Sequence, residues 1–228
     1  MLKNKNRNSA PAPPLAARKD PGLIAAKKFA RKHDAEPGHA FQVAKIATQI
    51  FALTRDLHGL GPAELRLLTA AAYMHDTGYG VRPMSHHKGA RKLILESNLS
   101  GFNERELKIV ACVARYHRKA HPAKSHRVYC DLDPASQHLV DQLAALLRIA
   151  DGLDRGHDAA TRAVRIQRTT NGLRFYIDQR RPSAIDLDGA MRKRALFEEV
   201  YGLAVEVLPD DSRAAPLRAT KETTPCAE

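Results

Sequence analysis

The sequence contains no tryptophan, and aromatic residues make up only 5% of its 228 residues. A platform of rings on which single-stranded nucleic acid could stack is therefore poorly supported. Cysteine is also scarce, because Cys112, Cys130 and Cys226 are the only three and no Cys-x-x-Cys spacing occurs. An odd number of scattered cysteines argues against a disulfide framework and against a cysteine-ligated zinc site.

Long apolar runs are missing as well. No stretch approaches the roughly 18 apolar residues of a membrane span, and neither end has the apolar run of a secretory signal. We therefore expect a cytoplasmic protein that does not enter a membrane. Both ends are polar, contain proline and lack apolar periodicity. This composition predicts a disordered basic tail over residues 1–21 and a second disordered tail over 209–228.

Positive charge is in surplus. The chain has 37 Lys and Arg against 25 Asp and Glu, a formal net charge of +12. Such a surplus favours a polyanionic partner such as a nucleotide, polyphosphate, nucleic acid or anionic lipid, although a generic basic surface is the alternative. Because no nucleic-acid-binding motif is present, we expect a phosphate-rich small molecule or polyphosphate rather than nucleic acid.

The hydrophobic pattern predicts a mainly α protein with a small α+β appendage. Apolar residues recur at helical spacing throughout residues 22–155, which indicates a helical bundle. Within 156–208, two alternating runs flank Thr170-Asn171-Gly172, and Asn-Gly between such runs is the strongest short-range hairpin signal. A charged helix at about 188–201 and a strand at 203–208 complete the appendage. Its exposed sheet edge could support a homodimer.

Polar residues interrupt the apolar stripes of four predicted helices. His39, His75, His117 and Asp151 each lie on such a stripe. A single histidine there is more often a hydrogen-bonded core residue. Several on facing helices are costly to satisfy separately, whereas one or two metal ions would satisfy them together. The sequence therefore predicts a divalent metal centre inside the bundle.

The dipeptide His-Asp is a weak signal, since it occurs at 33–34, 75–76 and 157–158. Only the pair at 75–76 ends an apolar helix and precedes a glycine turn, which lets both side chains point into the bundle. The donor set is imidazole and carboxylate without thiolate. It favours Mn, Fe, Co or Ni, or Mg with more waters, over structural zinc.

Two further histidines, His86 and His87, are predicted to lie in the loop before a short helix at 88–96. Either could serve a second ion with Asp76 as the bridging ligand, and His117 is placed to join it. An exposed polar loop is the alternative.

Basic residues accompany the predicted ligands. Arginine and lysine beside a metal suit a phosphate substrate, because they bind its oxygens while the metal polarises it. A solvated charge is the ordinary alternative for each of them. We expect Lys88, Arg115, Arg118 and Arg148 to bind substrate, within a wider basic set that adds Arg82, Lys119 and Arg155.

The order His39, His75-Asp76, Asp151 resembles the H…HD…D pattern of the HD superfamily of metal-dependent phosphohydrolases. The similarity is greater still to the HD-like C-terminal region of the exopolyphosphatase (Ppx/GppA) family, without the actin-like N-terminal portion to which that family's phosphatase chemistry is assigned. The similar segments are AAAYMHDTGYG (70–80), SHHKGARKLI (85–94), VARYHRKAHP (113–122), LLRIADGLDRGHD (146–158) and GAMRKRALFEEVYGLAVEV (189–207).

The resemblance implies an HD-type helical domain over 22–155 and a phosphate-rich ligand. It implies metal ligation by His39, His75, Asp76 and Asp151, with His86 and His117 as ligands of a second ion.

Three functions follow as hypotheses, of which the third, a nucleic-acid binder, rests on charge alone. The first is a metal-dependent phosphohydrolase, with one or two ions per chain and Asp76 as the catalytic residue that orients water or bridges the metals. Its candidate substrates are nucleotides, alarmones and polyphosphate. The second is a non-catalytic regulatory module that binds polyphosphate or a nucleotide.

Overall fold

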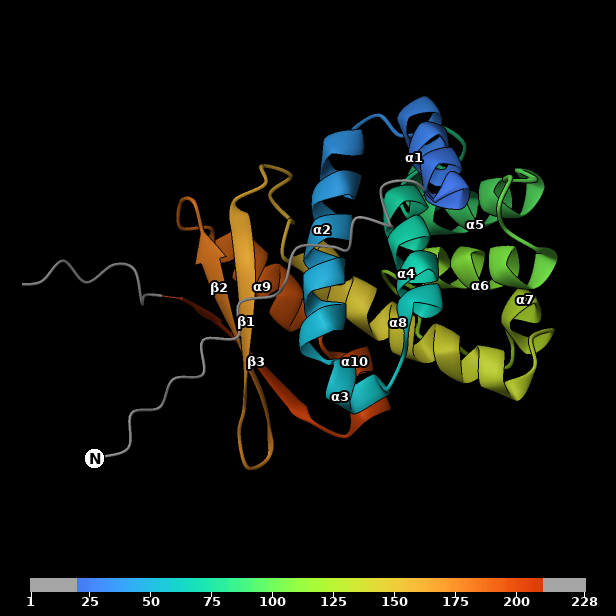
Figure 1. Cartoon of the computed structure of the whole chain (residues 1–228). Helices are drawn as coiled ribbons and strands as arrows, with labels where there is room; N and C mark the ends of the chain where they lie inside the picture. Colours follow the sequence, from blue (N-terminus) through green and yellow to red (C-terminus); the bar gives the residue numbers. More distant parts are fainter. Residues whose placement is uncertain (1–19, 211–228) are drawn as a thin grey trace, which may run out of the picture.

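The computed structural model describes residues 20–210. The two predicted tails therefore lie largely outside the described residues. Within them the fold is mainly helical, with a small three-stranded sheet near the C-terminal end, as the sequence predicted. Figure 1 shows the sheet at one end of the molecule and α5, α6 and α7 at the other.

Several helices of the bundle begin at residues that typically start a helix. Proline occupies the first turn of α1, α2, α4 and α8, where its missing N–H costs nothing. Asn103 caps α6 by accepting from the Glu106 N–H, at 2.9 Å. The helices are α1 (Pro21–His33), α2 (Pro37–Leu53), α3 (Arg55–His58), α4 (Pro62–Met74), α5 (His86–Glu96), α6 (Glu104–Arg115), α7 (Arg127–Cys130) and α8 (Pro134–Gly152).

One boundary differs from the prediction in a way that matters for function. His86 and His87 are not in a loop but form the first turn of α5, after a 3-10 turn at Pro83–Ser85. Both histidines are buried, at 2% and 5% exposure, so they are not part of an exposed polar loop either. Burial in the first turn gives their rings fixed positions against the bundle.

The sheet contains β1 (Thr161–Arg168), β2 (Gly172–Gln179) and β3 (Ala204–Pro209) in the order β1-β2-β3. The strands β1 and β2 form the predicted antiparallel hairpin, and β3 pairs in parallel with β2. The parallel pairing requires a crossover between β2 and β3, which two helices provide.

That crossover corrects another expectation. The single predicted helix at 188–201 is divided into α9 (Ala184–Lys193) and α10 (Ala195–Tyr201), with Arg194 between them. Directly after the break, Leu196 and Phe197 are buried, and Phe197 packs edge-on against Phe175 of β2. The break lets α9 and α10 both pack against α8 and β3.

The sheet and the bundle share one core. Buried apolar residues of both parts belong to a single cluster. Polar contacts also join β1 to α2, because the Val164 N–H donates to Gln49 Oε1 at 3.0 Å and Gln42 donates to the Thr161 carbonyl. None of the described helices is both long and apolar enough to cross a membrane.

Candidate metal centre

Six predicted ligands converge from the ends of five helices. His39 lies in the first turn of α2, His75 and Asp76 directly follow α4, and Asp151 lies in the last turn of α8. The remaining two are His86, which begins α5, and His117, which follows α6. All six are buried, with exposures between 0% and 7%.

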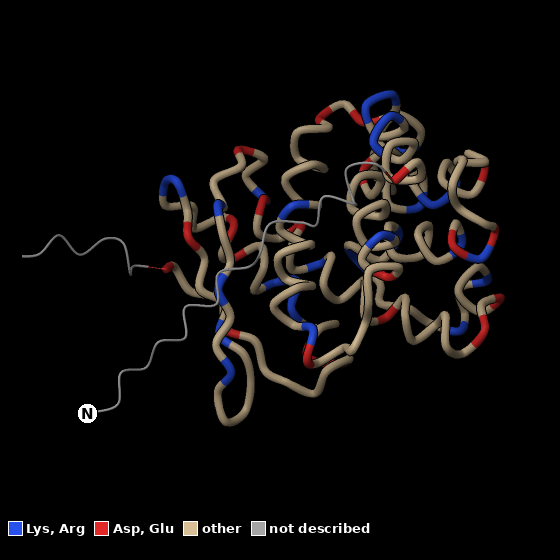
Figure 2. The backbone as a smooth tube through the Cα atoms, viewed as in Figure 1, with Lys and Arg blue, Asp and Glu red and all other residues tan. Residues whose placement is uncertain are grey.

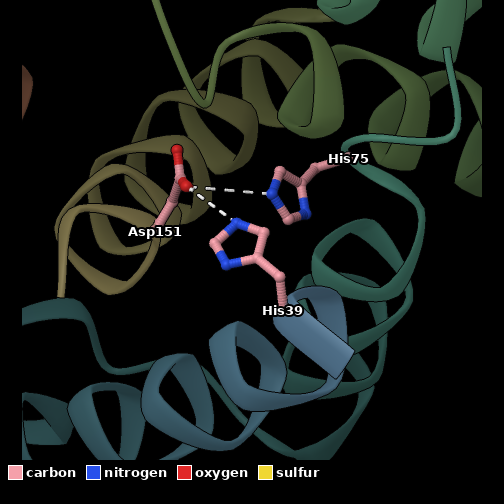
Figure 3. Close-up of side chains that lie close together, drawn as sticks. All are labelled: His39, His75 and Asp151. Carbon is pink, nitrogen blue, oxygen red and sulfur yellow. Dashed lines mark ion pairs between the residues drawn. The ribbon is translucent and has the colours of Figure 1, made fainter. Parts of the chain in front are cut away.

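The first group of ligand atoms contains His39, His75, Asp76 and Asp151. Asp151 Oδ1 lies 3.3 Å from His39 Nε2 and 3.8 Å from His75 Nε2, and Figure 3 shows both rings turned toward this carboxylate. Asp76 Oδ2 lies 3.5 Å from His75 Nε2 and 3.9 Å from His39 Nε2. Two imidazole nitrogens and two carboxylate oxygens therefore surround one point.

The second group is built on the other oxygen of Asp76. Asp76 Oδ1 lies 3.3 Å from His86 Nε2 and 3.5 Å from His117 Nε2. The two oxygens of one carboxylate thus face two different histidine pairs. This is the arrangement that a carboxylate bridging two ions requires.

Every histidine of the two groups turns its Nε2 inward because its Nδ1 is engaged elsewhere. An Nδ1–H that donates leaves Nε2 as the lone-pair atom, and such outer contacts fix a ligand's tautomer and ring orientation. The Nδ1 partners are Asp154 Oδ2 for His39 (2.8 Å), the Ala72 carbonyl for His75 (2.8 Å), the Ala114 carbonyl for His117 (2.7 Å) and the Pro83 carbonyl for His86 (3.3 Å).

Three atoms at the centre of this arrangement have no hydrogen-bond partner. They are His39 Nε2, His75 Nε2 and Asp76 Oδ1, and all three are buried. Leaving buried polar atoms unpaired costs free energy, so their convergence needs a physical reason. A divalent cation supplies one, and a set of imidazole and carboxylate donors fits it. Two sets of three residues each bring their ligand atoms within 4.8 Å of one another. One set is His39, His75 and Asp151, and the other is His75, Asp76 and His117.

The electrostatics favour a cation at this point. Burial opposes charge on Asp151, but Lys193 and His39 hold the pKa of this carboxyl well below its usual range. Burial likewise opposes charge on His39, yet the neighbouring carboxylates of Asp151 and Asp154 raise its pKa to about 10. Burial lowers the pKa of His117 well below its usual range, so its ring is neutral and able to ligate.

A cavity of about 300 Å³ opens beside Asp76 and Asp151. Its wall carries positive charge on both the bundle side and the α9 side, which suits an anionic ligand next to a metal. The cationic residues that line it are Arg118, Lys119, Arg148, Arg155, Arg192 and Lys193.

Of the four residues predicted to bind substrate, Arg118 and Arg148 line this cavity and two others do not. Arg118 Nη1 donates to His86 Nε2 at 2.9 Å, and Arg148 Nη1 donates to the Tyr116 carbonyl at 2.9 Å. Lys88 is exposed on α5, and the buried Arg115 lies over the ring of Tyr116 at 5.4 Å. The structure therefore places Lys88 and Arg115 away from the cavity.

His87 does not line the cavity either, although it is buried and its Nδ1 has no partner. Burial, with Arg118 as the next cause, lowers the pKa of His87 to about 4. Among the two candidate histidines of α5, the geometry brings only His86 to Asp76.

Sequence reasoning gave no site role to five residues of the site, one of which is Arg192 of the cavity wall. Asp154 follows Asp151 by three positions on the same helical face, which was a usable signal. His157 belongs to the third His-Asp dipeptide, and its ring stacks on that of His39 with centroids 3.9 Å apart. Lys193 forms an ion pair with Asp151 Oδ2, and Tyr79 stacks on His86 at 3.9 Å.

Comparison with known proteins gives a consistent result. The model of Ppx/GppA phosphatase, domain III, matches residues 24–183. Guanosine-5'-triphosphate,3'-diphosphate pyrophosphatase of Pseudoalteromonas translucida (strain TAC 125) is 27% identical over 113 residues, which are 48% of this chain. The match covers 22% of that relative's length.

Proposed function

The chain belongs to the Ppx/GppA phosphatase family, and we propose that it is a metal-dependent phosphohydrolase that acts on a phosphate-rich substrate. The observation that carries this proposal is the convergence of three buried, unpartnered ligand atoms beside a cationic cavity. Family membership supports the phosphate chemistry. Because the match covers 22% of the relative, that protein's activity is not transferred to this chain.

His39, His75, Asp76 and Asp151 would hold the first divalent ion, and Asp76, His86 and His117 the second, for which His86 Nε2 would exchange its contact with Arg118 for the ion. When bound, such an ion activates water and neutralises charge on the phosphoryl group under attack. Asp76 is the proposed catalytic residue, because a carboxylate shared by both groups can orient the attacking water. Mn, Fe, Co, Ni and Mg all suit these donors.

The cavity wall would bind the substrate's phosphates. Arg118 and Arg148 approach from the bundle and Lys193 approaches from α9, so a phosphoryl group beside Asp76 would meet cations on two sides. The substrate classes that fit are nucleotides, dinucleoside polyphosphates, guanosine polyphosphate alarmones and inorganic polyphosphate. The similarity to a guanosine-5'-triphosphate,3'-diphosphate pyrophosphatase favours a guanosine polyphosphate among them.

The second candidate is a non-catalytic module that binds polyphosphate or a nucleotide. The six cations of the cavity wall favour it, because they would bind an anion without a metal. Binding that survives removal of divalent ions, in a protein that hydrolyses nothing, is the outcome that this candidate requires.

Phosphate release by the full chain loaded with Mn²⁺, measured across those substrate classes, tests the proposal. The variant His75→Ala/Asp76→Ala should lose both Mn²⁺ binding and hydrolysis. The matched control is His138→Ala, an exposed histidine on α8, the helix that carries Asp151. Hydrolysis that persists in the double variant, or no hydrolysis of any substrate by the unmodified chain, would overturn the proposal.

A further inference from the structure

A second group of cations lies between α5 and α6, on residues that do not line the metal cavity. Arg91 is on α5 and Arg115 is the last residue of α6. Arg115 is only 8% exposed, and Arg91 has a buried Nε atom without a hydrogen-bond partner. His126 lies beside them, because burial and then the charges of Arg115, Arg91 and Lys88 lower its pKa, and Lys88 is exposed on α5. We refer to Arg91, Arg115, Lys88 and His126 as the α5–α6 cluster.

Neither guanidinium of the cluster has an acidic partner. Within residues 20–210, no carboxylate oxygen lies within 4.0 Å of Arg91 or Arg115, and neither side chain makes a hydrogen bond. Figure 2 shows acidic residues interspersed with basic ones over much of the chain, and Arg66 is an arginine that does pair, with Asp20 at 2.9 Å and Glu106 at 3.2 Å. Arg91 and Arg115 lack such a counter-charge.

The neighbours of the cluster are neutral. Burial raises the pKa of the Cys112 thiol to about 12 and that of the Tyr116 hydroxyl to about 12, so neither supplies negative charge at neutral pH. Tyr116 offers only its ring face to Arg115 and its hydroxyl to His126 Nδ1, at 2.9 Å. Burial and the charge of Arg115 lower the pKa of Arg91, which is the expected effect of an unpaired neighbour of like charge.

Guanidinium groups bind phosphate oxygens through paired N–H donors, and two of them on the packed helices α5 and α6, each without a carboxylate partner, leave those donors available. Arg115 is buried, and Arg91 is half-buried with a buried Nε that has no partner, so holding these like charges without a counter-charge costs free energy that a bound anion would remove. An exposed lysine at the edge of the pair adds long-range attraction for the same ligand.

We propose that the α5–α6 cluster is a second anion site, which binds a phosphate group independently of the metal centre. The ligand class is inorganic phosphate or a phosphate group of an oligophosphate. This site needs neither a metal ion nor hydrolysis, so it goes beyond the proposed function and can fail or succeed separately.

Calorimetric titration of the full chain in EDTA tests the site, with tripolyphosphate and inorganic phosphate as separate probes. The background variant is His75→Ala/Asp76→Ala, in which the metal centre is disabled. We expect a binding component that Arg91→Gln weakens at least tenfold. Lys92→Gln is the matched control, because Lys92 is exposed on the same helix and pairs with Glu96. Isotherms of Arg91→Gln and Lys92→Gln that superimpose would overturn the site.

Thermal unfolding gives a second readout that does not depend on binding heats. Without phosphate, Arg91→Gln should unfold at a higher temperature than the unmodified chain, because one of two repelling charges is gone. Phosphate should then raise the unfolding temperature less than it does in the unmodified chain. A lower unfolding temperature for Arg91→Gln in phosphate-free buffer would show that Arg91 is a satisfied structural residue and would contradict the proposal.

Discussion

Asp76 links the two ligand groups, because each of its oxygens faces a different pair of histidines. No other residue of the site has this role. Asp151 directs one oxygen to the histidines and the other to Lys193. The ligand atoms are in turn contacted by Asp154, which bonds His39, and by Lys193, which pairs with Asp151. Substitution of each tests its role.

Asp154 orients His39 and is therefore a positioning residue. Replacing it by asparagine removes the charge that supports the His39 Nδ1–H, so we expect the Asp154→Asn variant to bind Mn²⁺ about 10 to 100 times more weakly. Titration calorimetry measures the affinity, with the exposed Asp131→Asn as the control. Equal affinities of the two variants would show that the contact between Asp154 and His39 does not support a ligand.

Lys193 neutralises Asp151 from α9. The Lys193→Met variant leaves a buried carboxylate with less countercharge, so we expect the metal-free protein to lose about 1–3 kcal/mol of stability. Its Mn²⁺ affinity should rise, because no ammonium competes for Asp151. Denaturant unfolding in EDTA measures the stability, and Mn²⁺ titration measures the affinity. A fall in both the stability and the Mn²⁺ affinity would contradict the idea that Lys193 competes with the ion for Asp151.

At the scale of elements, close glycine contacts set the distances between helices. A Cβ at Gly78 would overlap the backbone of His86 and Ala90, and a Cβ at Gly152 would overlap that of Ala190. The first contact seats α5 against the turn that carries Asp76, and the second seats α9 against α8. The sequence indicated the glycine turn after His75-Asp76, but not its partner, since close approach is a property of two elements.

The Gly78→Ala variant tests this contact. We expect α5 to move away and take His86 with it, at a cost of about 1–3 kcal/mol in stability. The stoichiometry of bound Mn²⁺ should fall, because the second group loses a ligand while His39, His75 and Asp151 remain. Gly80→Ala is the matched control in the same turn, where an added Cβ meets nothing within 4 Å. Unchanged stoichiometry in Gly78→Ala would contradict a second site built on His86.

At the scale of the molecule, the small sheet and its crossover helices are not a separate attachment. They share the core of the bundle and contribute Lys193 and Arg192 to the cavity wall. The edge strands of the sheet are β1 and β3, but α2 bonds the Val164 N–H and the Thr161 carbonyl of β1, and Glu198 accepts from the Val205 N–H of β3. The homodimer stays a prediction.

The free energy of metal binding should depend on pH. The pKa of His39 is raised to about 10 in the fold, above its ordinary value of 6.5. Its proton therefore stabilises the metal-free fold fully below pH 6.5, and this contribution is lost as the pH rises toward 10. A metal ion at Nε2 must displace that proton, so Mn²⁺ binding at pH 8 should release about one proton per site. Titration in two buffers of different ionisation enthalpy measures the release, and identical heats would rule it out.

The sequence by itself determined the helical class and the hairpin, and it named the histidines and aspartates that the structure brings together. Apolar periodicity, the Asn171-Gly172 turn and polar residues on apolar stripes are local patterns, and each reflects a local physical requirement. The histidines and aspartates could be recognised because burying them separately is costly.

Only the tertiary structure decided which charges meet. It brought Lys193 to Asp151 across 42 residues and His39 to Asp154 across 115. It also separated Lys88 and Arg115 from Arg118 and Arg148, although all four have the same chemistry. The face of a helix on which a cation lies follows from the sequence, but the element that faces it depends on how the helices pack. For that reason the buried histidines and aspartates were predictable from the sequence, and the charged residues around them were not.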